Sequence, residues 1–189
     1  MPGVLHVCTA NRCRSAIAER LMRVALPGDV PVTSAGTRAR PGEPIWPGAA
    51  AELERRGISA LGFASHPLQP ALLDGADLVL TATRRHRDEL VAQHPRALRR
   101  TFTWRELAWL VDGLSVDDLP GDTPAERLAG LAAVAGTRRG ARTPPPPRLL
   151  DVDDPVDGPA GAVEVAAREI EQALAPVVLL LTVGVRPPR

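Results

Sequence analysis

Lysine is absent from this chain of 189 residues, so all 23 of its basic groups are arginines. A protein without lysine cannot form a Schiff base through a side-chain amine and has no lysine general base. The P-loop nucleotide hydrolases are excluded as well, because their loop lysine reaches the nucleotide phosphates.

Cysteine and aromatic residues are scarce. The chain has two Cys, no Tyr and only 3% aromatic residues. Two cysteines cannot build a disulfide scaffold or a four-thiolate metal site. His6, His86 and His94 do not have metal-ligand spacing, and we interpret them as structural or exposed. We therefore expect no metal and no cofactor.

Long hydrophobic runs and a strong charge bias are also missing. The longest apolar run, residues 177–183, is too short to cross a bilayer, and the N-terminus lacks the basic start of a secretory signal. A formal net charge of +1 provides no whole-chain field that would attract nucleic acid or a membrane. We expect one cytoplasmic domain that binds neither.

Strand-like and helix-like segments alternate along the chain. Short β-rich runs predict strands at residues 4–7, 30–34, 77–81 and 101–104. Apolar residues at helical spacing predict helices at residues 14–25, 47–56, 84–93, 105–111, 123–135 and 163–174, with a Pro/Arg/Gly-rich loop at 136–148. This order predicts an α/β fold with a largely parallel sheet, whose ligand site lies at the carboxyl ends of the strands.

The turn after the first strand carries the chemistry. It reads Cys8-Thr9-Ala10-Asn11-Arg12-Cys13-Arg14-Ser15, and a helix is expected to start at about Cys13. Backbone N–H groups in the turn and at the helix N-terminus attract a phosphate, and Arg14 offers it two parallel donors. The same field favours a Cys8 thiolate, to which Ser15 would donate a hydrogen bond. A thiolate beneath a bound phosphoryl group predicts a phosphocysteine intermediate.

Cysteine followed six residues later by arginine is a weak signal alone. Cysteine is often a small buried hydrophobe, and an arginine-rich chain produces this spacing by chance. The position of the pattern between the first strand and the first helix is what makes it specific.

Residues 7–15 resemble the signature of the low-molecular-weight protein-tyrosine-phosphatases. Further resembling blocks are Ser34-Ala35-Gly36-Thr37, Gly42-Glu43-Pro44, residues 74–80 with Arg85-His86, and residues 151–155. The resemblance spans about residues 3–175. It implies a single domain over residues 1–175 with a four-stranded parallel sheet flanked by helices on both faces. Residues 112–148 match poorly and are interpreted as a variable insertion, and residues 176–189 as a C-terminal tail.

The resemblance implies that Asp154 is the general acid of a metal-independent phosphomonoester hydrolase acting on a phosphorylated protein or a small phosphomonoester. Chemistry supports that role, because an oxygen leaving phosphorus needs a proton and the resulting carboxylate can activate water. Asp153 is the alternative acid. The aspartates of residues 151–157 can also be no more than polar residues of a Pro/Gly turn.

The family also implies supports for the loop. Asn11, Ser15 and Ser34 match residues that brace it. Phe63 falls near the position of a bracing histidine, so the brace is incomplete, and His66 is a candidate substitute. Ala10 stands where the family usually has glycine, which predicts a slightly altered loop. The family further implies a reversible disulfide between Cys8 and Cys13, whereas a buried core cysteine is an equally good interpretation of Cys13.

The expected rim of the site departs from the family. Arg38 and Arg40 stand where an aromatic wall is expected, and Val156 and Asp157 follow Pro155 in place of aromatic residues. Trp46 is a candidate rim aromatic or a packing residue of the following helix. Arg38, Arg40 and Arg12 would favour a substrate with additional negative charge, unless they only solubilise the surface.

Two other functions remain open. Thioredoxin-coupled arsenate reductases share the fold and the cysteine loop but need cysteines beyond the loop, which this chain lacks. A catalytically weak phosphate-binding regulatory module is the second alternative, given Ala10, Phe63 and the missing rim aromatics.

Overall fold

The computed structural model describes residues 3–184, and its centre is a parallel sheet with strand order β2-β1-β3-β4. The strands are β1 (Val4–Cys8), β2 (Val32–Gly36), β3 (Leu78–Thr81) and β4 (Thr101–Thr103). All residues of β1 and β3 are buried, because helices cover both faces of the sheet.

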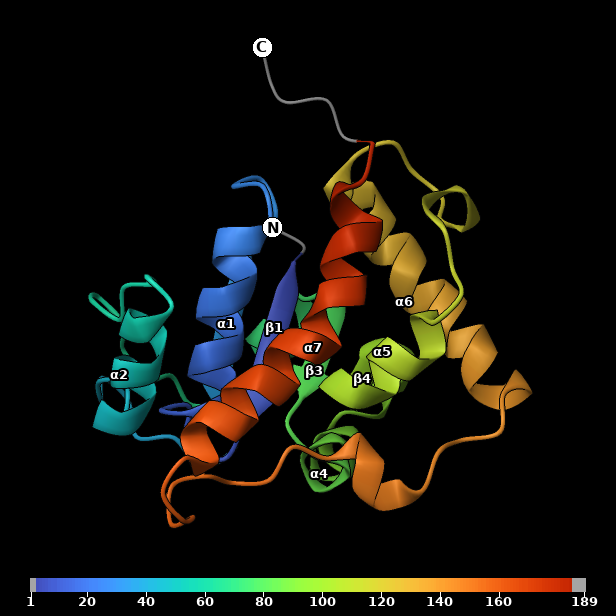
Figure 1. The fold of residues 1–189 in the computed structure, drawn as a ribbon. Helices are drawn as coiled ribbons and strands as arrows, with labels where there is room; N and C mark the ends of the chain where they lie inside the picture. The colour runs from blue at the N-terminus through green and yellow to red at the C-terminus, as the bar shows by residue number, and fades with distance from the viewer. Residues whose placement is uncertain (1–2, 185–189) are drawn as a thin grey trace.

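Helices pack against the sheet (Figure 1), and alternate residues of β1 belong to two different cores. Val4 and Cys8 belong to the larger core, built with α1 (Arg14–Ala25), α2 (Pro47–Arg55), α5 (Trp104–Val111), α6 (Pro124–Ala141) and α7 (Ala162–Thr182). Leu5 and Val7 face the smaller core, built with α3 (Pro70–Asp74) and α4 (Arg84–Gln93). The described part also has three 3-10 helices, η1 (Pro95–Arg100), η2 (Val116–Asp118) and η3 (Pro147–Leu150). The predicted fold class is confirmed.

Two expectations about the C-terminal third are corrected. The helix predicted at residues 123–135 continues to Ala141, so the first part of the expected 136–148 loop is helical. The last helix does not end at residue 174 but continues through Pro176 to Thr182. Proline removes one helical hydrogen bond. Val177, Leu180 and Leu181 beyond it are buried in the core, and this packing favours continuing the helix. The expected tail therefore contributes its first residues to the core, while residues 185–189 lie outside the described chain.

Smaller differences concern element bounds. β2 occupies residues 32–36 rather than 30–34, Trp104 begins α5 rather than ending β4, and α3 was not predicted. α3 has five residues, too few for a periodic apolar pattern to appear.

Loops following the strands meet at one edge of the sheet. The backbone N–H of Thr37 donates to Cys8 O at 2.9 Å, that of Ala82 donates to Val7 O at 2.9 Å, and that of Val152 donates to Ala82 O at 2.9 Å. Gly36 is required at this junction, because a Cβ there would lie 2.5 Å from Thr9 O. The sheet thus brings residues 8–14, 36–38, 82–86 and 151–155 together.

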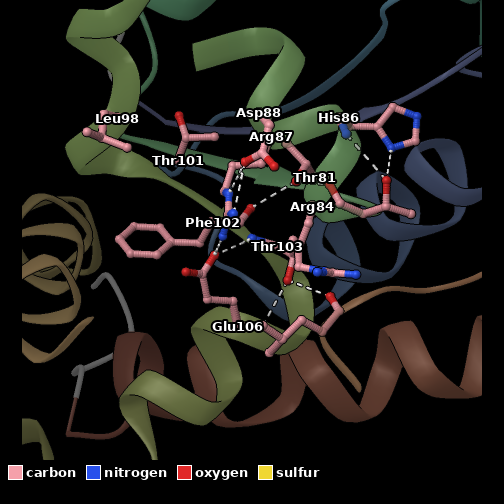
Figure 2. A network of polar contacts seen from close by, with 12 residues as sticks. Thr81, Arg84, His86, Arg87, Asp88, Leu98, Thr101, Phe102, Thr103 and Glu106 are labelled. Carbon is pink, nitrogen blue, oxygen red and sulfur yellow. Dashed lines mark hydrogen bonds and ion pairs between the residues drawn. The ribbon is translucent and has the colours of Figure 1, made fainter. Parts of the chain in front are cut away.

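The buried carboxylate of Glu106 connects the end of β4 to two helices. Figure 2 shows Arg87 of α4 and the backbone of Thr103 converging on Glu106 of α5. Glu106 also accepts a hydrogen bond from Arg139 Nε of α6 at 2.8 Å. This residue links α6, which lies in the stretch of residues 112–148 that resembles the family poorly, to the sheet.

Candidate active site

The first and last residues of the turn between β1 and α1, Cys8 and Arg14, are buried. β1 ends at Cys8, Cys13 is the N-cap of α1, and the helix begins at Arg14. Cys8 is 3% exposed and Arg14 is 4% exposed, although Arg14 carries a charge. A helix N-terminus and a buried guanidinium at the same turn form a site for an anion.

Asn11 holds the shape of this turn. It is the only non-glycine residue with positive φ in the described chain, at 56°, a conformation that asparagine tolerates better than most residues. Its Nδ2 donates to Ser15 Oγ at 3.0 Å and to Ser34 Oγ at 2.7 Å, and its Oδ1 accepts from His66 N at 2.8 Å. Ala10 is exposed and lacks positive φ, so the left-handed position of the turn is Asn11 and not Ala10.

Ser15 connects this brace to the predicted nucleophile. Its Oγ lies 3.0 Å from Cys8 Sγ. Ser15 Oγ accepts from Asn11, and its single proton has two acceptors within reach, Cys8 Sγ at 3.0 Å and Ala35 O at 3.5 Å, of which the sulfur is the nearer. The hydroxyl is thus placed beside the predicted nucleophile.

Glu19 is a bracing residue that the sequence analysis missed. It is buried on α1, accepts a hydrogen bond from Ser34 Oγ and pairs with Arg23 at 3.1 Å. The available signal was its position four residues after Ser15, which places a carboxylate on the buried face of an amphipathic helix. The expected imidazole substitute is not observed, because His66 contributes its backbone N–H and exposes its side chain.

Arg14 and Asp154 lie together at the centre of the site. Arg14 Nη2 is 2.5 Å from Asp154 Oδ2, and Arg14 Nη1 donates to Val152 O at 3.1 Å. The Asp154 side chain is 51% exposed, so it reaches both the guanidinium and solvent. Asp153 is exposed and has no hydrogen bond in the described chain, while Asp151 pairs with Arg84 at 3.0 Å. The geometry therefore brings Asp154, and neither neighbour, to Arg14.

A cavity of about 250 Å³ opens over Arg14. Its lining includes Thr9, Arg38, His86 and Asp154. No Phe, Trp or Tyr belongs to the described lining.

His86, interpreted from the sequence as structural or exposed, is buried beside the phosphate-binding turn. Its Nε2 lies 2.9 Å from Thr9 Oγ1 and its Nδ1 lies 2.7 Å from Thr83 Oγ1. Burial, with a smaller effect of the Arg14 charge, lowers the pKa of His86 to about 4. The neutral ring therefore joins the phosphate-binding turn to the start of α4.

Cys13 is buried beside the turn, and both cysteines are free thiols. Burial first, and then the nearby Cys8 and Asp154, raise the pKa of the Cys13 thiol to about 12. It is a protonated thiol at neutral pH, and its disulfide with Cys8 stays a prediction.

The predicted rim residues separate into two groups. Arg38 lines the cavity, whereas Arg40 is exposed outside its lining. Arg12 is turned away, since its Nε donates to Pro44 O at 3.0 Å and its Nη1 lies 3.4 Å from Glu43. Trp46 is half-buried against the core, and its ring covers Gly48 in the first turn of α2. Of the two roles considered for Trp46, the structure shows packing.

Other features constrain the site less. Among residues 3–184 no three His, Cys, Asp or Glu side chains are grouped so that they could hold a metal ion. In the same range, no helix has the length and apolar character needed to span a membrane.

Comparison with known proteins decides the family. The family model described as low molecular weight phosphotyrosine protein phosphatase matches residues 3–118. The chain belongs to this family. It is therefore a protein phosphatase of the low molecular weight class. The matched residues include the turn and the loops at residues 36–38 and 82–86, and they end before the loop that carries Asp154.

Its similar proteins carry two kinds of name. A probable low molecular weight protein-tyrosine-phosphatase, EpsP of Ralstonia solanacearum, is 36% identical over 55% of this chain and 71% of its own. A protein-arginine-phosphatase of Geobacillus stearothermophilus is 36% identical over 67% of this chain and 84% of its own.

Solved structures of the family extend the likeness beyond the matched residues. The YwlE arginine phosphatase from Geobacillus stearothermophilus superposes with a TM-score of 0.67 and 28% identity, covering 94% of this chain and 91% of its own. The tyrosine phosphatase AmsI of Erwinia amylovora has a TM-score of 0.69 at 20% identity, over 95% of this chain and 93% of its own, which shows the shared fold.

Proposed function

We propose that this phosphatase works through a phosphocysteine formed on Cys8. The observation that carries the proposal is that Cys8, Ser15 and Arg14 lie on one turn, with Ser15 Oγ 3.0 Å from Cys8 Sγ. Asp154 Oδ2 lies 2.5 Å from Arg14 Nη2 of the same turn. Arg14 and the backbone N–H groups of residues 9–14 bind the phosphate dianion and stabilise the charge on its equatorial oxygens in the transition state.

Two displacements complete the reaction. In the first, the Cys8 thiolate attacks phosphorus, the bond to the leaving group breaks, and protonated Asp154 gives its proton to that leaving atom. In the second, the Asp154 carboxylate takes a proton from water, the water oxygen attacks phosphorus, and the P–S bond breaks. Ser15 stabilises the released thiolate through its hydrogen bond.

Replacing the nucleophile tests the mechanism. Cys8→Ser should lower hydrolysis of p-nitrophenyl phosphate by about 10³-fold or more, because nucleophile replacements remove most of the rate enhancement. Binding of vanadate, measured by calorimetry, should largely survive, since Arg14 and the backbone donors remain. Acid-quenched wild-type enzyme should carry a phosphoryl group on the peptide containing Cys8. Unchanged turnover in Cys8→Ser would disprove the mechanism.

We propose a phosphorylated protein as the substrate and the reducing cytoplasm as its location, where the Cys8 and Cys13 thiols stay free. Phosphoarginine is a second candidate beside phosphotyrosine. The lack of an aromatic side chain in the described cavity lining gives a tyrosine ring nothing to stack on, and one similar protein is an arginine phosphatase. Comparing kcat/KM for matched phosphotyrosine and phosphoarginine peptides decides between them.

A further inference from the structure

Two arginines stand at the boundary between the catalytic cavity and a second hollow. The second hollow has a volume of about 610 Å³ and shares Arg38, Arg85 and Glu89 with the lining of the catalytic cavity. Arg38 and Arg85 are both exposed. A group bound between them therefore lies in the same cavity as a phosphoryl group bound at Arg14.

These two arginines differ from the charged residues around them. Within residues 3–184 neither Arg38 nor Arg85 belongs to an ion pair, whereas Arg84 pairs with Asp151 at 3.0 Å and Asp88 pairs with Arg87 at 2.9 Å. Among the carboxylates of the two linings, Glu89 is the one at the boundary, and no ion pair within the described chain neutralises it. Two free guanidinium groups against one free carboxylate leave the boundary positive.

Arg38 is connected to the phosphate-binding turn by its own backbone, and Arg85 through the neighbouring residue His86. The N–H of Arg38 donates to Thr9 O at 2.8 Å. Arg85 precedes His86, whose ring contacts Thr9 Oγ1 at 2.9 Å. Neighbouring residues of an extended peptide are about 3.5 Å apart along the chain, so the residues that flank the phosphorylated one are the substrate groups nearest to this boundary.

We propose that Arg38 and Arg85 form an anion subsite that selects phosphopeptides with an acidic side chain beside the phosphorylated residue. The proposal rests on the proposed phosphatase mechanism and deepens it by naming the substrate class. The substrate is selected by charge and not by ring stacking, since the described cavity lining offers no Phe, Trp or Tyr. Glu89 opposes the subsite and limits how strongly it binds an anion.

The test uses short phosphopeptides that differ only in the residues flanking the phosphorylated residue, glutamate in one and glutamine in the other. Each is made with phosphotyrosine and with phosphoarginine, and the better-hydrolysed version is used. Wild-type enzyme should prefer the glutamate peptide in kcat/KM, and salt should reduce this preference. Arg38→Gln and Arg85→Gln should each lower the preference about two- to fivefold, as expected for one exposed charge pair. Glu89→Gln should raise it.

Arg168→Gln is the matched control, because Arg168 is exposed on α7 and belongs to neither lining. It should leave the preference unchanged. p-Nitrophenyl phosphate separates the two proposals: absence of its hydrolysis by wild-type enzyme contradicts the proposed mechanism. If it is hydrolysed, three results overturn the subsite: no preference for the glutamate peptide, no cleavage of either peptide, or equal losses for both peptides in the arginine variants.

Discussion

At the scale of single residues, Asp154 is the group whose proposed role depends most on the leaving group. A general acid contributes about 10²–10⁴-fold when the leaving atom is a poor leaving group and less when it departs unaided. We expect Asp154→Asn to lower kcat for a phosphotyrosine peptide by about a hundredfold, and to lower kcat for p-nitrophenyl phosphate distinctly less. Steady-state kinetics on both substrates measures the difference.

Asp153→Asn is the matched control for this prediction. Asp153 is adjacent and exposed but does not contact Arg14. It should keep wild-type rates on both substrates. An equal loss for both substrates in Asp154→Asn would argue against its acid role.

At the scale of elements, the loop carrying Asp154 is held by α4 and α5. Arg84 donates to Asp151 through its backbone N–H at 2.7 Å and through Nη2 at 3.0 Å, and Arg105 Nη1 donates to Asp151 O at 3.1 Å. Asp151 is therefore a positioning residue, because it fixes where the loop leaves η3, three residues before the proposed acid.

Weakening the hydrogen bonds of Asp151 should cause a smaller loss of kcat of the same kind as Asp154→Asn. We expect Asp151→Asn to lower kcat for the phosphotyrosine peptide about tenfold through misplacement of Asp154, with little change for p-nitrophenyl phosphate. Asp157→Asn, which alters an exposed residue beyond Pro155, should have no such effect. Equal losses on both substrates would instead indicate general disruption of the loop.

At the scale of the whole molecule, Glu106 connects helices from distant parts of the chain to the sheet, and Figure 2 shows its contact with Arg87 of α4. It is 4% exposed and lies 3.0 Å from Arg87 of α4 and 2.8 Å from Arg139 of α6. Removing the charge of a buried carboxylate leaves its cationic partners uncompensated.

Glu106→Gln should therefore lower the free energy of unfolding by about 1–3 kcal/mol. Denaturant unfolding measures this loss, and the remaining folded enzyme should keep the wild-type KM for p-nitrophenyl phosphate. Glu169→Gln is the control, because the half-buried pair of Glu169 with Arg105 at 3.5 Å should contribute less than about 1 kcal/mol. Equal stability of both variants would contradict a structural role for Glu106.

Part of the fold and of the site can be predicted from short segments of the sequence. The alternation of strands and helices, the turn from Cys8 to Ser15 and the aspartates before Pro155 follow from short-range spacing, because neighbouring residues share one turn or one face. That spacing predicted the parallel sheet and the position of the phosphate-binding turn. The resemblance to the family favoured Asp154 as the general acid and left Asp153 as the alternative.

Tertiary structure decided what depends on residues distant in sequence. Asp154 is 140 positions from Arg14, and their contact exists only because the last loop crosses the carboxyl ends of the strands. The same holds for Glu19 beneath Ser34 and for Arg38 and Arg85 at one boundary. The continuation of α7 through Pro176 likewise depends on burial against other helices. Amino-acid order determined which groups were present, and packing determined which of them meet, because side-chain contacts across a fold are set by the geometry of the whole core.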